Sequence, residues 1–273
     1  MPINVKTVQV KSDIFANNTN ITAIDCNFLP WENNTVSFAN CVNLTKVRNF
    51  NDAVTNMADC FINCSNLSVA PILPASVTNV SGAFTNCTRL TNASILPNNV
   101  VDVSNCYLGC TNLKYGPLTI PNSVTNIEGM FSGCSNLITI PNIPDNVTSL
   151  YQVFSGCNSI SNVYIDSENI TNVTDIFANT TQTKNVYIQF QNNSVNTTTY
   201  NTFYAAGYRT DGSYANTYLI DSGSPVPPTP PTPGPNSIDV TGYVYSVDNG
   251  VVTLLDAPID ANGEVTFPNI EEE

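Results

Sequence analysis

A large aromatic residue recurs along most of this chain at an almost constant spacing. At intervals of 23 or 24 residues the chain carries Phe15, Phe38, Phe61, Phe84, Tyr107, Phe131, Phe154 and Phe177, and Tyr200 stands one step further. Several of these aromatics open the same motif, as in Phe61-Ile-Asn-Cys64-Ser-Asn-Leu67. A fixed period of this length is typical of a solenoid, because a single repeat cannot bury its apolar face without a neighbour.

Each repeat holds one short segment with the alternation expected of a strand. It lies six to eleven residues after the aromatic, as in 162–165 (NVYI) and 185–190 (NVYIQF). A proline follows in the middle repeats and ends the strand, because proline has no N–H to donate to a ladder. The rest of each repeat is too short for more than a turn or one helical turn. We therefore predict a β-solenoid with a parallel sheet of one short strand per turn and a mostly irregular or short helical convex side.

Cysteine also follows the repeat. Three residues after an aromatic stand Cys41, Cys64, Cys87, Cys110, Cys134 and Cys157. Equivalent positions on adjacent turns lie roughly 5 Å apart, and a free cysteine packs as a small, weakly polar residue. This predicts a column of buried, reduced thiols, with oxidation between neighbouring cysteines as the alternative. The chain has no histidine, so it cannot form a Ser-His-Asp or Cys-His catalytic arrangement, and we expect no metal and no cofactor.

Asparagine recurs five residues after the aromatic. This position holds Asn20, Asn43, Asn66, Asn112 and Asn136. Asparagine side chains readily bond to backbone groups at turns, and backbone groups at a bend need such partners when the curved chain leaves them unpaired. We expect these amides to bond the backbone where the chain bends.

The repeat between Leu113 and Leu137 resembles the BspA-like leucine-rich repeat. It contains Leu118-Thr-Ile-Pro121, Asn122-Ser-Val-Thr125, Met130-Phe131, Gly133-Cys134 and Asn136-Leu137. The resemblance covers about residues 15–200. It implies a leucine-rich-repeat β-solenoid that serves as a protein-binding or adhesive scaffold without catalytic activity. The family occurs on bacterial and protist surfaces and in virus-encoded proteins.

Composition and pattern divide the chain into four parts. They predict an N-terminal cap strand (1–14), a solenoid of about eight repeats with a C-terminal cap (15–221), a Pro-rich linker (222–237) and a small acidic β module (238–273). The linker composition favours an extended polyproline II spacer. The module contains a hairpin signal around Asn249-Gly250. A segment this small rarely buries a sufficient core alone, so we expect it to pair with copies of itself or to dock onto another protein.

The charge distribution limits the partners. The net charge is −13, and residues 238–273 hold eight acidic residues and no basic one. No basic stripe suited to nucleic acid is present, and no run of about 18 apolar residues suggests a membrane span. We therefore predict no nucleic acid partner and no membrane insertion.

The concave sheet face is the candidate ligand-binding site. Strand positions expected to face outward include Lys46, Arg48, Tyr115, Asn162, Tyr164, Asn185 and Tyr187. We expect Tyr164 and Tyr187 to stand on neighbouring turns, flanked by Asn162 and Asn185. Tyrosine and asparagine suit contact with a sugar or a peptide, because tyrosine offers a large area for little loss of rotamer freedom. The alternative is an ordinary solvated sheet face.

These features predict a non-enzymatic recognition or decoration protein of a bacteriophage virion, in its head, tail or fibre. Its concave face would meet a host-surface protein or glycan. Residues 238–273 would bind other virion or surface proteins, or further copies of the chain. The start, Met1-Pro-Ile-Asn-Val-Lys6, has no recognisable secretory signal, which favours the virion. The alternatives are a bacterial cell-surface adhesin and an interaction scaffold in the cytoplasm.

Overall fold

The structure is a computed structural model of the 273-residue chain. It describes residues 11–26, 31–160, 162–165, 167–180, 186–190, 198–208, 217–220, 236–238, 244–248 and 251–256, and for the strands after residue 180 the backbone alone. The chain divides into two compact units, residues 1–228 and 229–273. Each unit is described by itself.

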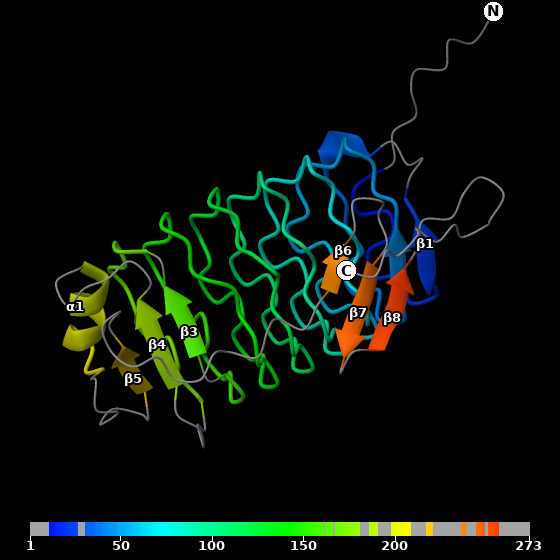
Figure 1. Cartoon of the computed structure of the whole chain (residues 1–273). Coiled ribbons are helices and arrows are strands. Elements are labelled where there is room, and N and C mark those ends of the chain that lie inside the picture. The colour runs from blue at the N-terminus through cyan, green and yellow to red at the C-terminus, as the bar shows by residue number, and fades with distance from the viewer. Residues whose placement is uncertain are drawn as a thin grey trace, which may run out of the picture. The chain divides into compact units, whose positions relative to one another are not determined.

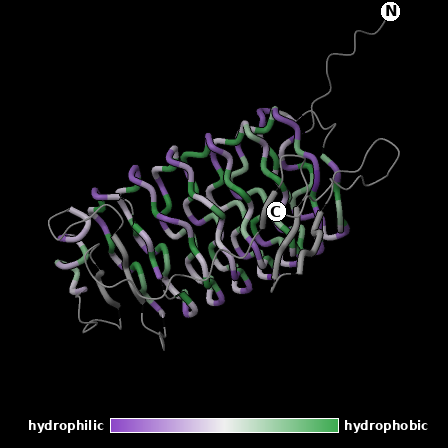
Figure 2. Tube along the Cα trace, in the orientation of Figure 1, coloured by the Kyte–Doolittle hydropathy of each residue, from purple (hydrophilic) through white to green (hydrophobic). Residues whose placement is uncertain are grey.

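The first unit is a solenoid of stacked turns (Figure 1). One column of aromatic rings runs through its core. We call the rings of Phe15, Phe38, Phe61, Phe84, Tyr107, Phe131, Phe154 and Phe177 the aromatic column. Each ring stacks on the next with centroids 5.3–6.1 Å apart and planes within 19°. Apolar and polar segments alternate within the turns (Figure 2). The 23-residue period therefore places one ring per turn in a continuous core.

The turns are joined by backbone hydrogen bonds that run along the column. The N–H of Phe61 donates to the Ala83 carbonyl at 2.8 Å, and the N–H of Phe84 donates to the Cys106 carbonyl at 2.8 Å. Further on in each repeat, isolated parallel bridges link Thr35, Asn56, Asn79, Asp102 and Asn126 in series and Ser149 to Asn172. These bonds satisfy the buried backbone where no regular sheet is present.

Strands occur only towards the two ends of the described solenoid. β1 (Ala23–Asp25) pairs in parallel with β2 (Lys46–Arg48) at a register of 23 residues. The 3-10 helix η1 (Glu32–Asn34) lies between them in sequence. β3 (Asn162–Ile165), β4 (Val186–Phe190) and β5 (Thr217–Ile220) form a second parallel sheet in that order.

The predicted strand in every turn is wrong for the middle repeats. There the equivalent segments form only the bridges Asn92 to Tyr115 and Tyr115 to Thr139. Two residues further along, three of these turns carry Pro71, Pro117 and Pro141. Proline has no N–H for the ladder, so pairing cannot extend beyond one residue.

The ends of the solenoid differ from the repeats. Residues 12–17 form turns, with the Ala16 N–H bonded to the Asp13 carbonyl at 2.9 Å. The predicted cap strand (1–14) is therefore wrong for residues 12–14, because this segment is the aromatic turn of the first repeat. Residues 1–10 lie outside the described part. At the other end, the helix α1 (Thr198–Ala205) closes the solenoid (Figure 1).

Tyr200 does not join the aromatic column as its spacing predicted. It lies in α1 and stacks on Tyr204. Tyr208 instead meets Phe177 edge-on, with centroids 6.3 Å apart and planes at 72°, and it also packs against buried Phe203. An edge-on ring leaves no parallel face for a further ring, so the stack ends here.

The second unit contains a three-stranded antiparallel sheet. β6 (Asn236–Ile238), β7 (Val244–Asp248) and β8 (Val251–Asp256) pair in that order, with Asp248 opposite Val251. In the sequence, Asn249 and Gly250 stand between β7 and β8, and they lie outside the described residues. The first two residues of β6, Asn236 and Ser237, fall within the range predicted for the linker, 222–237.

Candidate ligand-binding face

The N-terminal part of the candidate face is charged. Lys46 and Arg48 lie on β2 as half-buried residues on either side of buried Val47. The register of β1 and β2 places Lys46 beside Ala23 and Arg48 beside Asp25. The Asn49 Nδ2 donates to Asp25 Oδ2 at 2.8 Å. This part of the face therefore presents a carboxylate and two cationic groups on two neighbouring turns.

The middle of the face carries no charge on its strand positions. Tyr115 is half-buried and bridges Asn92 on one side and Thr139 on the other. Pro117, two residues after Tyr115, is buried. Tyr115 is several turns from both Lys46 and Tyr164, so the structure does not gather the six predicted residues that it describes into one cluster. They are spread along the solenoid.

The C-terminal part of the face has a different pairing from the predicted one. On β3, half-buried Asn162 and Tyr164 alternate with buried Val163 and Ile165. The register places Asn162 beside Tyr187, and Tyr164 beside Gln189. Tyr164 and Tyr187 thus stand on neighbouring turns, as predicted, but two register positions apart rather than side by side. Asn185 lies outside the described residues.

The shift has a simple origin in the length of the repeat. Asn162 follows Phe154 by eight residues, whereas its partner Tyr187 follows Phe177 by ten. Two extra residues precede β4, and a shift of two keeps the same residues on the same face of a strand. The register of β4 and β5 also places Tyr218 beside Tyr187. The sequence prediction missed Tyr218 and Gln189, although the alternation in Thr217-Tyr-Leu-Ile220 signals a strand.

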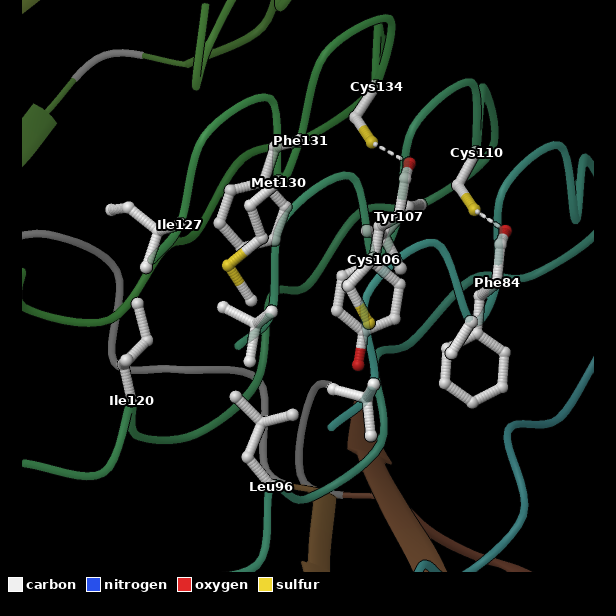
Figure 3. Packing of buried hydrophobic residues seen from close by; sticks show 14 of the residues in the cluster. Phe84, Leu96, Cys106, Tyr107, Cys110, Ile120, Ile127, Met130, Phe131 and Cys134 are labelled. Carbon is white, nitrogen blue, oxygen red and sulfur yellow. Dashed lines mark hydrogen bonds between the residues drawn. The ribbon is translucent and has the colours of Figure 1, made fainter. Parts of the chain in front are cut away.

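The cysteines belong to the interior. All nine cysteines are free and buried, including the six for which the repeat predicted a buried column. In the cysteine column (Cys41, Cys64, Cys87, Cys110, Cys134 and Cys157) each Sγ–H donates to the carbonyl of the aromatic residue one turn back, at 2.9–3.2 Å. Figure 3 shows this bond from Cys110 to Phe84 and from Cys134 to Tyr107. Burial raises the pKa of the Cys64, Cys110 and Cys157 thiols to about 12, which suppresses the nucleophilic thiolate.

The asparagine amides tie successive turns together. The Nδ2 groups of Asn43, Asn112 and Asn136 donate to carbonyls of the preceding turn at 2.7–2.8 Å, as predicted, whereas Asn66 Nδ2 donates to the Asn43 side-chain oxygen at 3.3 Å. A second series, which the sequence prediction missed, lies two residues after the aromatic. Its amides bond one another in a ladder that joins Asn17, Asn40, Asn63 and Asn86 at 2.8–2.9 Å. These side chains therefore hold neighbouring turns of the solenoid together.

Two further observations concern the described residues alone. No group of three or more metal-ligating side chains occurs among them. Within the same part of the chain, no helix has both the length and the apolar character needed to cross a membrane.

The geometry therefore defines a leucine-rich-repeat fold with parallel strands. The chain belongs to the BspA type leucine-rich repeat family, whose family model matches residues 1–114 and 103–209 in six copies. Leucine-rich-repeat families are generally protein-interaction modules. No curated protein sequence matches the chain significantly.

Solved structures with a similar fold come from bacteria. A leucine-rich repeat protein of T. pallidum is 24% identical, with a TM-score of 0.45 over 57% of this chain and 72% of that one. One from Bacteroides ovatus is 19% identical, with a TM-score of 0.40 over 78% and 64%. A leucine rich cell surface protein of Faecalibacterium prausnitzii is 18% identical, with a TM-score of 0.39 over 79% and 83%.

Proposed function

We propose that this chain is a non-enzymatic recognition protein that displays its solenoid face on a bacteriophage virion, as a fibre or as a decoration of the head or tail. The face would bind a protein or glycan of the host surface. The observation that carries the proposal is the row of strand positions Asn162, Tyr187 and Tyr218 across β3, β4 and β5.

The composition of this row suits recognition. Tyr164 and Gln189 pair beside it, so three tyrosines and two amides occupy neighbouring register positions without a charged residue. Tyrosine supplies a large contact area with only two rotatable side-chain bonds, and amides both donate and accept hydrogen bonds. Such a set can bind an uncharged polar ligand without burying an unpaired charge.

The composition of the solenoid interior also supports a recognition role. The aromatic and cysteine columns fill the core of the described repeats, and the cysteine thiols donate to backbone carbonyls of the aromatic residues. Burial raises the pKa of these thiols and of the Tyr107 hydroxyl, so the groups stay neutral and uncharged inside. The exposed face is then the part of the solenoid left for an interaction.

Residues 238–273 are proposed as the anchor. Among the described residues their strands lie in a sheet of the order β6-β7-β8, and an outer strand of a sheet can pair with a strand of a partner. The segment is acidic and carries no basic residue, so a basic or polar docking surface would suit it. The Pro-rich stretch before it would hold the solenoid away from the anchor at up to about 3.1 Å per residue.

A bacterial cell-surface adhesin is the second candidate, and membership of the BspA type family favours it. In that case the same face would bind a host or matrix component, and the C-terminal unit would hold the chain at the cell. The two candidates differ in what the C-terminal residues bind: a virion protein or a component of the bacterial surface.

The anchoring role is tested with three proteins: the full chain, a chain ending at Ser222, and residues 238–273 fused to an unrelated carrier. Each is mixed with purified virions that lack the protein, and with bacterial cells, and the bound fraction is measured by sedimentation. The full chain and the fusion should bind virions, while the shortened chain should remain folded and unbound. If the shortened chain binds virions as well as the full chain does, the assigned anchor is wrong, and binding of the fusion to cells alone supports the adhesin.

The recognition role is tested on the face. Tyr164→Ser with Tyr187→Ser should reduce adsorption of the labelled full chain to host cells. Tyr151→Ser is the matched control, because Tyr151 is an exposed tyrosine of the same solenoid outside the strand positions. Equal loss in both variants, or in neither, would contradict the proposed face.

A further inference from the structure

Three aliphatic side chains lie exposed at one equivalent position on three consecutive turns. Ile72, Ile95 and Leu118 each follow the aromatic of their turn by eleven residues and are 47%, 37% and 53% exposed. We call these three residues the apolar row. These side chains are not part of the core. On the first two turns the next residue, Leu73 or Leu96, is buried instead.

The apolar row has sharp limits. The equivalent position is the exposed residue Asn49 on the preceding turn and exposed Asn142 on the following one. The segments around the row, 69–73, 92–96 and 115–119, contain no charged residue. An exposed apolar strip bounded by polar residues is the pattern expected of an interaction surface rather than of scattered surface hydrophobics.

The spacing of the apolar row limits the shape of its partner. The rings of Phe61, Phe84 and Tyr107, which belong to the same three turns, lie 5.3 and 5.4 Å apart and so measure the rise from turn to turn. An α-helix advances about 5.4 Å per turn, so its apolar stripe presents one side chain per turn at the same spacing. In an extended strand, the side chains on one face repeat only about every 6.6–6.8 Å. Such a strand would be out of step by about 2.6 Å after two turns.

We propose that the apolar row is a docking site for an amphipathic α-helix of a partner protein, lying parallel to the solenoid axis with one aliphatic side chain beside each of the three turns. This is a helix-on-surface mode of recognition, read through residues spaced i, i+3 or i+4, and i+7. The uncharged surroundings match a helix whose apolar stripe is flanked by uncharged polar residues, because no charge would be left desolvated. The inference rests on the proposed binding role but on residues separate from Tyr164 and Tyr187.

The probes are two synthetic peptides of identical composition, made of leucine, glutamine and serine. One is stapled as a helix with leucine at i, i+4, i+7 and i+11, and the other alternates leucine with polar residues to favour an extended chain. Fluorescence anisotropy measures the binding of each peptide to the full chain. The helical peptide should bind with saturation, and the extended peptide at least about tenfold more weakly, a difference of about 1.4 kcal/mol.

The test variant is Ile72→Asn with Ile95→Asn and Leu118→Asn, since asparagine already stands at this position on the flanking turns. It should lower the affinity for the helical peptide by about tenfold or more with an unchanged circular dichroism melting curve. Leu118→Asn alone provides a milder version. The matched control is Val101→Asn with Ile138→Asn, which removes two aliphatic residues that are 46% and 40% exposed at other repeat positions.

Each remaining outcome decides against the proposal. No saturable binding of the helical peptide, equal binding of the extended peptide, or equal loss in the control variant would overturn it. Self-association of the full chain that the row variant abolishes would show that a second copy is the occupant instead. Tyr164→Ser with Tyr187→Ser should leave helix binding unchanged, so failure of the proposed host-binding face and failure of the apolar row are separately visible.

Discussion

The hydroxyl oxygen of Tyr107 lies 3.0 Å from Ser94 Oγ and accepts a hydrogen bond of 3.2 Å from the Ser94 backbone N–H. Both residues are buried. Tyr107 is the one tyrosine of the aromatic column. Ser94 stands at the position where three other turns carry Pro71, Pro117 and Pro141. Tyrosine in place of phenylalanine at 107 and serine in place of proline at 94 therefore belong together. The buried Tyr107 hydroxyl needs a polar partner, and the buried Ser94 N–H needs an acceptor.

Tyr107→Phe should destabilise the fold although phenylalanine fills this position in the neighbouring turns. The change leaves the buried N–H of Ser94 without its partner, at a cost of about 1–3 kcal/mol. Chemical denaturation monitored by circular dichroism measures the loss. The control is the double variant Tyr107→Phe with Ser94→Pro, which restores the pattern of the other turns and should recover most of the stability. Strict additivity of the two single changes would show that the residues are not coupled.

The buried thiols should be inert towards alkylating reagents in the folded protein. Burial raises the pKa of Cys64 and Cys110 to about 12, so almost no thiolate exists at neutral pH. Mass spectrometry after iodoacetamide treatment should find these residues unmodified in the native protein and modified in denaturant. Disulfides between members of the cysteine column under non-reducing conditions would contradict the observed hydrogen bonds to the aromatic carbonyls.

The same shift predicts how stability depends on alkaline pH. The pKa of the Cys64, Cys110 and Cys157 thiols is about 12 in the folded chain and near the ordinary value of 9.0 in the unfolded chain. Above pH 9 the unfolded state loses protons that the folded state keeps, so stability is constant below that pH and falls as pH rises from 9 towards 12. Denaturation midpoints measured from pH 7 to pH 10.5 should show the fall. It should be shallower when Cys64, Cys110 and Cys157 are all replaced by serine, which does not titrate in this range.

Core and surface positions of one repeat should respond very differently to truncation. Leu137→Ala removes a fully buried side chain and should cost about 2–5 kcal/mol. Asn142→Ala, at an exposed position of the same repeat, should be nearly silent. Thermal or chemical unfolding compares the two directly, and similar losses would mean that the assignment of positions within the repeat is wrong.

The asparagine ladder makes a prediction about backbone geometry. Asn63 has a φ of 61°, and its side chain bonds Asn40 and Asn86. Asn63→Ala loses both bonds and keeps the left-handed backbone, which costs roughly 1–2 kcal/mol for an ordinary residue. Asn63→Gly loses the bonds alone and should be more stable than the alanine variant by about 1 kcal/mol. Glycine already stands at the equivalent position 109, with a φ of 72°. A glycine variant less stable than the alanine variant would contradict the argument.

The aromatic spacing was enough to predict the solenoid and its interior. A ring, a cysteine and a leucine recur at fixed offsets, and stacking equivalent residues is the one way for such repeats to bury them together. Phe61, Cys64 and Leu67 are accordingly fully buried. The asparagines at the bends were predictable for the same reason, since Asn112 and Asn136 repeat with the core.

The register and the ends required the tertiary structure. The pairing of Asn162 with Tyr187 depends on how many residues the chain uses between Phe177 and β4, and connection length is not part of the repeat. The absence of regular strands from the middle turns depends on whether a bridge can grow past Pro117, which is a competition between neighbouring turns.

The sequence by itself thus determined what each repeat buries, because burial follows from the identity and period of its residues. The tertiary structure alone decided which face residues become neighbours across turns. It showed that Tyr164 lies beside Gln189 and that Ile72, Ile95 and Leu118 share one exposed position. The physical reason is that hydrogen bonds between turns set the register, and those bonds join residues that are distant along the chain.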